Sequence, residues 1–171
     1  MRIPVLIILL AINAVGCHQA EEKASLIEVA EFGNSMAIGL SVNSENRVFT
    51  SFPNYDGDGN LAVAEIKNGA LHPYPDATWN TSKNDDRHFL RVQDLYVDKE
   101  DLLWVLDSKP GSSGNIFADG KEEQEEGYFK LVKINTKSNL VEAVFLFEDL
   151  DKSRSALNDV RVDTDRKLAY L

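Results

Sequence analysis

The segment DLYVDKEDLLWVLDS, residues Asp94–Ser108, consists of two β-rich runs joined by an acidic turn. Branched and aromatic residues dominate both runs, and the Asp, Lys and Glu residues between them favour a tight connection. The segment therefore predicts a β-hairpin. Two other segments have the same order of strand, acidic turn and strand, namely GLSVNSENRVFTSF from Gly39 and DVRVDTDRKLAYL from Asp159.

The three predicted hairpins form an internal repeat. When Val42, Val97 and Val162 are aligned, the repeats are separated by 55 and 65 residues, and each Val precedes an Asn or Asp that opens the turn. Such a period, with several strands in each unit, is typical of a β-propeller blade. Further strands are predicted between the hairpins, which gives four strands per repeat; they cover residues 61–66, 88–92, 128–134 and 141–147.

The repeat predicts an all-β fold, a partial β-propeller of which about two and a half blades are present. The last residues, Ala169-Tyr170-Leu171, fall within a predicted strand, so we expect the chain to be a fragment. We expect the full-length ring to be a monomer. The expected organisation is a signal peptide over residues 1–17, a linker and first strand over 18–30, and a partial propeller over 31–171.

The N-terminus predicts export. MRIPVLIILLAINAVGC has one basic residue, an apolar run over Val5–Ala14 and the only cysteine of the chain, Cys17. The run is too short to span a bilayer as a mature helix. Ala14–Cys17 resembles a bacterial lipobox, which predicts lipidation of Cys17 and a lipoprotein of the bacterial cell envelope. Cleavage for ordinary secretion of a soluble extracellular or periplasmic form is the alternative.

The net charge of the chain argues against some partners, and its cysteine content excludes an intramolecular disulfide. The formal net charge of -10 repels phosphate backbones and anionic lipid head groups, so we expect no nucleic-acid partner and membrane contact only through a lipid anchor. A single cysteine cannot form an intramolecular disulfide, so packing must hold the exported domain together.

Five segments taken in order resemble the major royal jelly protein and yellow family, and together they span Gly39–Leu171. They are RVFTSFPNYDGDG, LHPYPDATWN, DLYVDKEDLLWVLDS, KLVKIN and ALNDVRVD. The resemblance implies a six-bladed propeller. Its insect members include pigmentation proteins linked to dopachrome conversion and salivary proteins that bind biogenic amines, and bacterial relatives are described as dopachrome tautomerase-related. Two features depart from the family: Lys109-Pro110 stands where Gly is typical, and the paired cysteines of insect members are absent.

Ligands of propellers bind in the central channel, where the innermost strand of each blade begins. In this chain those positions predict a ligand site formed by Gln93, Asp94, Asn158 and Asp159. Asn158 and Asp159 are also candidate ligands of a cation such as calcium, because the pair is similar to an Asn-Asp pair of the gluconolactonase and regucalcin family. The structural alternative for the aspartates is that each accepts backbone N–H bonds from a neighbouring turn.

The acidic segment NYDGDGN, residues 54–60, predicts a second calcium candidate through Asp56 and Asp58, whose spacing is close to that of an EF-hand loop. The flanking residues read as strands, so a hairpin turn is favoured. We expect His72 and His88 to lie on the surface. Trp79 and Trp104 are predicted to lie in the core.

Two functions remain open at this level. The first is binding of a small organic molecule, such as an amine, in the channel. The alternative is an enzyme that acts on a small cyclic substrate, either a dopachrome-type tautomerase or a metal-dependent, gluconolactonase-like hydrolase. The sequence identifies no catalytic residue and no cofactor beyond the candidate calcium.

Overall fold

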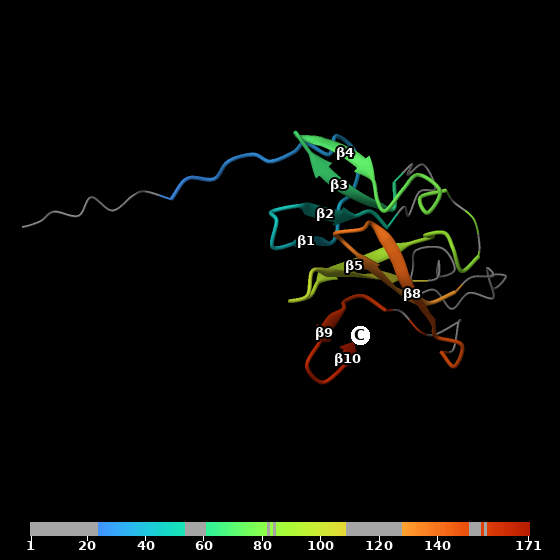
Figure 1. The fold of residues 1–171 in the computed structure, drawn as a ribbon. Coiled ribbons are helices and arrows are strands. Elements are labelled where there is room, and N and C mark those ends of the chain that lie inside the picture. The colour runs from blue at the N-terminus through green and yellow to red at the C-terminus, as the bar shows by residue number, and fades with distance from the viewer. Residues whose placement is uncertain are drawn as a thin grey trace, which may run out of the picture.

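The computed structural model describes residues 24–53, 61–81, 83, 85–108, 128–150, 155 and 157–171. These residues form ten β-strands and no helix, arranged in three antiparallel sheets (Figure 1). The all-β prediction is therefore confirmed. This part of the chain has no helix long and apolar enough to cross a membrane.

Each sheet is a meander, in which strands that follow one another in the chain are also neighbours in space. The first sheet consists of β1 (Leu40–Val42), β2 (Val48–Ser51), β3 (Val63–Lys67) and β4 (Ala70–Pro73). The second consists of β5 (Val92–Val97), β6 (Leu102–Asp107), β7 (Lys130–Asn135) and β8 (Leu140–Leu146). The third is a hairpin of β9 (Arg161–Asp163) and β10 (Leu168–Tyr170).

The three hairpins of the repeat are β1–β2, β5–β6 and β9–β10, as the sequence predicts. The strand predicted at residues 88–92 is wrong, because β5 begins only at Val92. The fourth strand of the first sheet is instead β4, which ends at Pro73 and was not predicted. Proline lacks an N–H donor and is tolerated there because β4 is the edge strand. The described part of the segment 18–30, residues 24–30, forms no strand.

Side-chain hydrogen bonds explain the shared turn of the first two hairpins. Asn43 Oδ1 accepts the backbone N–H groups of Glu45 and Arg47, and Asp98 Oδ1 accepts the equivalent two, from Glu100 and Leu102. The fourth residue of each turn, Asn46 in one and Asp101 in the other, has a positive φ of 60° or 62°. Asn and Asp tolerate this left-handed conformation better than other residues with a Cβ, so the acidic turns encode the hairpins.

The three sheets stack face to face, with the second sheet in the middle (Figure 1). Trp79 and Trp104 are both partly buried against the two apolar clusters that result, in agreement with their predicted place in the core. The first cluster lies between the first and second sheets, and its buried members are Phe49, Ala62, Val63, Tyr74, Phe89, Val92, Leu95, Leu103, Val105, Val132 and Ile134. The second lies between the second sheet and the β9–β10 hairpin, and its buried members are Leu106, Leu131 and Val160.

Candidate functional site

The first strands of the three repeats, β1, β5 and β9, approach one another near one carboxylate, that of Asp94 in β5. Asp94 Oδ2 accepts the backbone N–H of Val160 at 3.0 Å and lies 2.8 Å from Nη1 of Arg161. On its other side Asp94 approaches the first repeat at Gly39. A Cβ added to Gly39 would lie 3.0 Å from Asp94 Oδ1 and 3.1 Å from the backbone N of Leu95, so only glycine permits this approach.

An irregularity in strand β5 places Asp94. The pairing of β5 with β6 shifts register between Val92 and Asp94, so Gln93 lies at a bulge between the two. Such bulges change the direction of a side chain relative to the regular pleat. Gln93 and Asp94 are both buried.

The other two predicted ligand residues, Asn158 and Asp159, are exposed and directly precede the buried Val160. The residue that follows this pair, Val160, donates its backbone N–H to Asp94. Asp94 itself has the contact that the structural alternative predicted, a backbone N–H from a neighbouring segment. Its second contact is an ion pair with Arg161.

Arg161 is a member of this site that sequence reasoning missed. Its side chain is largely exposed, and its guanidinium carbon lies 5.8 Å from the ring centroid of Tyr96. The signal was present, since an Arg follows Asn-Asp-Val at the start of the third repeat. Arg161 thus brings a cation to Asp94 from the segment that also carries Asn158 and Asp159.

A fully buried ion pair lies at the end of the second sheet. Lys130 Nζ is 3.1 Å from Asp107 Oδ2, and both side chains are 0% exposed. Asp107 also accepts the backbone N–H groups of Leu90 at 2.9 Å and Arg91 at 2.7 Å. Burial raises the pKa of Asp107, against the opposing effects of Lys130 and of these two hydrogen bonds.

The same lysine fixes the segment before β5. Lys130 Nζ donates to the carbonyl of Asp85 at 3.0 Å and to the carbonyl of His88. His88 is only 7% exposed, so its predicted surface position is wrong; that of His72 is confirmed. The Nδ1 atom of His88 lies 2.5 Å from Asp85 Oδ1, and this hydrogen bond lowers the pKa of Asp85. Its Nε2 atom is buried and has no partner in the described part of the chain.

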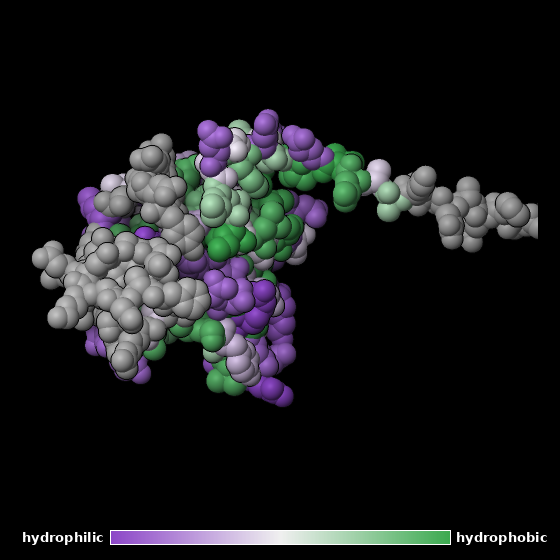
Figure 2. All heavy atoms as spheres, turned by 180° about the vertical axis from the view of Figure 1, so that it is seen from behind, coloured by the Kyte–Doolittle hydropathy of each residue, from purple (hydrophilic) through white to green (hydrophobic). Residues whose placement is uncertain are grey.

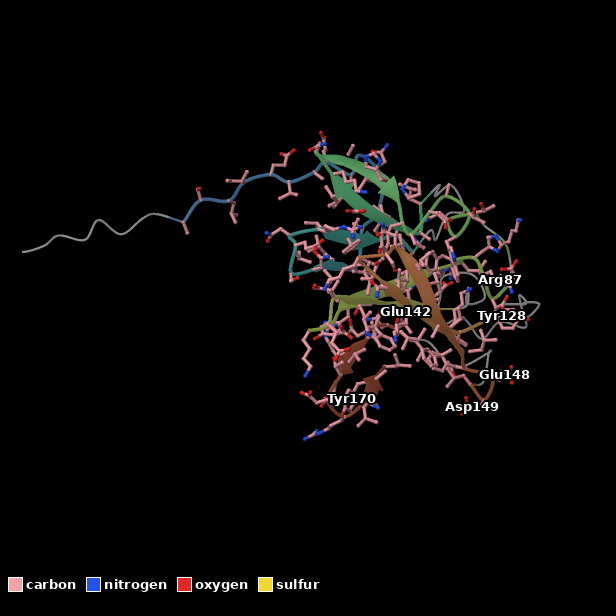
Figure 3. All side chains as sticks on the ribbon, viewed as in Figure 1. Arg87, Tyr128, Glu142, Glu148, Asp149 and Tyr170 are labelled. Carbon is pink, nitrogen blue, oxygen red and sulfur yellow. The ribbon has the colours of Figure 1, made fainter. Side chains whose placement is uncertain are left out.

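Arg87, Tyr128, Glu148 and Asp149 lie along the side of the molecule where β5 begins and where the chain enters β7 and leaves β8 (Figure 3). Tyr170 lies apart from them, at the end of the stack formed by β9 and β10 (Figure 3).

No cluster of three or more His, Cys, Asp or Glu side chains able to hold a metal is found in the described ranges. Cys17, Asp56 and Asp58 lie outside them. Comparison of the whole chain with protein-family models and with curated proteins found no match.

Proposed function

We propose that the chain is an exported β-propeller protein of the major royal jelly and yellow type, which binds a small polar organic molecule at the channel end of its innermost strands. The observation that carries the proposal is the convergence of the three repeats on Asp94, which is bonded to the segment that carries the exposed Asn158, Asp159 and Arg161. Propeller ligands bind where the innermost strands of the blades meet. The stacked meanders support the blade assignment, and the number of six blades comes from the family resemblance.

The charges of the site favour a cationic ligand group. Asp94 is already neutralised by Arg161, at 2.8 Å, so it supplies little attraction for a second cation. Asp159 is exposed and has no ion-pair partner among the described residues. A primary amine could pair with Asp159, while Asn158 and Arg161 supply hydrogen bonds to a hydroxyl or carbonyl of the same molecule.

Calorimetric titration of the mature protein with a panel of small amines tests this proposal. Asp159→Asn keeps the size of the side chain and removes its charge, so we expect the affinity for an amine to fall about tenfold. Glu31→Gln removes one charge from the exposed N-terminal segment and serves as the matched control, with unchanged affinity expected. Equal affinities in wild type and Asp159→Asn would contradict the proposal.

Titration with calcium in the same experiment addresses the enzymatic alternative. Calcium binding that disappears in Asn158→Ala would place a cation at the Asn158-Asp159 pair and favour a metal-dependent hydrolase. Amine binding that is independent of calcium supports a carrier or receptor.

A further inference from the structure

The energetics of the buried ion pair of Asp107 and Lys130 do not by themselves explain its presence. Seen from behind, hydrophilic side chains form a band across the middle of the molecule (Figure 2). Asp107 and Lys130 contribute nothing to the surface, since both side chains are 0% exposed. The cost of removing two charges from water offsets most of their attraction, so apolar residues of similar size often replace such a pair without loss of stability. The groups that the pair binds are therefore the better guide to its role.

The pair holds the segment that precedes β5, residues 85–91, by its backbone. Lys130 Nζ donates to two carbonyls of this segment, and the carboxylate of Asp107 accepts two of its N–H groups, those of Leu90 and Arg91. The segment forms no strand, so these bonds take the place of a β-ladder. The path of the chain into β5 thus depends on two side chains from β6 and β7.

Asp107 also fixes the point at which β5 begins. Its backbone lies opposite Val92, the first residue of β5, while its carboxylate binds the two residues before Val92. The next pair of the ladder joins Asp94 to Leu106, so β5 advances by two residues where β6 advances by one. Val92 cannot slide along β6 without breaking the hydrogen bonds to the carboxylate of Asp107.

The direction of the Asp94 side chain depends on this register. Asp94 Oδ2 accepts the backbone N–H of Val160 at 3.0 Å, which joins the second repeat to the third. Successive side chains of a strand point to opposite faces of the sheet, so a shift of one residue would turn Asp94 away from Val160. The bulge between Val92 and Asp94 sets which face the carboxylate takes, because a bulge re-aims the side chain beside it.

We propose that Asp107 and Lys130 are positioning residues for Asp94. By holding the segment 85–91 they fix the bulge in β5, and with it the direction of the carboxylate at the candidate ligand site. The importance of this role for ligand binding rests on the proposed function, whereas the direction of the carboxylate can be measured without a ligand. Neither residue touches the ligand in this proposal.

Amide hydrogen exchange of the wild-type chain gives the first test. Opening of the segment 85–91 exposes the N–H groups of Leu90 and Arg91, and it should also release Asp94 and so expose the N–H of Val160. We therefore expect the N–H of Val160 to be no more protected than those of Leu90 and Arg91. If Val160 stays more protected than both, Asp94 keeps its place when the segment opens, and the inference fails.

Two double variants give the second test, and both contain Lys130→Met so that no buried charge is left unpaired. Asp107→Asn keeps an acceptor oxygen for the segment 85–91, whereas Asp107→Leu has a similar size and keeps none. We expect protection of the Val160 N–H to fall about tenfold or more in the Leu variant and to change little in the Asn variant. The reference is the N–H of Val97, which donates to Ser41 Oγ at 2.8 Å at the other end of β5 and should change little in both.

Val132→Ala is the matched control for stability, because Val132 is a buried residue on β7 and its truncation removes no hydrogen bond of the segment 85–91. It should affect the N–H groups of Val160 and Val97 alike. If the Leu variant also affects the two alike, the pair acts on stability only and the inference is wrong. Unchanged protection of Val160 in the Leu variant overturns it as well.

Titration of the same variants with amines connects the result to the proposed function. The Leu variant should bind about tenfold more weakly than the wild type, and the Asn variant should bind like the wild type. A wild-type chain that binds no amine contradicts the proposed function, while the amide exchange still decides whether Asp107 and Lys130 position Asp94.

Discussion

The two faces of the second sheet bury equivalent positions of the repeat to different extents. On the side of the first sheet, Phe49, an aromatic residue that recurs at the same position of the next repeat, is fully buried within a large apolar cluster. On the other side, the equivalent Trp104 stacks on Phe145 at 6.1 Å between ring centroids, and Phe145 is still 46% exposed. Among the described residues, the sheet that faces Phe49 has four strands and the sheet that faces Trp104 has two.

The charged groups also differ in burial between the two interfaces. The first interface is closed at one end by Asp107 and Lys130 and at the other by Arg47, which binds both carboxylate oxygens of Glu65 at 2.7 and 2.9 Å. Arg47 also reaches the second sheet, where it donates to Asn139 Oδ1 at 2.8 Å. The pairs at the second interface are more exposed, because the side chains of both Arg161 and Lys99 lie largely in solvent. The Asp107–Lys130 pair of the first interface is thus fully buried, whereas the cations of the second interface lie largely in solvent.

The largest effect is expected from Lys130→Met. The substitution leaves the carboxylate of Asp107 buried without its counter-charge, which should lower the free energy of unfolding by about 3–5 kcal/mol. Urea denaturation followed by fluorescence measures the loss. Lys133→Met is the control on the same strand, since Lys133 pairs with Glu142 at the surface, and it should cost less than about 1 kcal/mol. Equal losses in the two variants would refute the contrast between buried and rim charges.

The second prediction compares the two recurring aromatics directly. Phe49→Ala should lower the free energy of unfolding by about 3–4 kcal/mol, because it leaves a cavity in a closed cluster. Trp104→Ala should cost about half as much despite the larger ring, because its site is open to solvent and can collapse. Denaturant titrations of both variants give the two losses in free energy of unfolding to be compared. A greater loss for Trp104→Ala would show that the second interface is as well packed as the first.

The smallest effect is expected in the pH dependence of the free energy of unfolding. It comes from Glu65, which pairs with Arg47 at the first interface. Burial would raise the pKa of Glu65, but the hydrogen bonds from Arg47 and Lys67 more than offset it and lower this pKa below its usual value of 4.5. A lowered folded-state pKa means that the contribution of Glu65 to stability is present above pH 4.5 and is lost as pH falls through the folded-state value. Free energies of unfolding measured from pH 6 to 3 should therefore decline less steeply in Glu65→Gln than in the wild type. Parallel declines would contradict the assignment.

The repeat could be predicted from the sequence because its signals are local. Branched residues on both sides of an Asn or Asp turn specify each hairpin, and the side chains of Asn43 and Asp98 then satisfy the turn within four residues of themselves. Strand β4 lacked such signals, since its four residues end in proline. The segment 88–92 was misassigned because Phe89 packs in the interface between sheets without forming a strand, and only Val92 belongs to β5.

The candidate site was only partly predictable, for a physical reason. The sequence placed Asp94, Asn158 and Asp159 at the starts of innermost strands, and the repeat required those starts to lie close together. It could not show that Arg161 neutralises Asp94, because the 2.8 Å contact joins residues that are 67 positions apart.

Local chemistry thus determined which elements form, namely the strands, the hairpins and the acidic turns that join them. Tertiary structure alone decided which charges are buried and which face solvent. Lys130 and Lys133 occupy one strand, three residues apart, yet one is enclosed with Asp107 and the other lies at the surface with Glu142. Burial depends on which sheet packs over each face, and that contact is made by residues far away in the sequence.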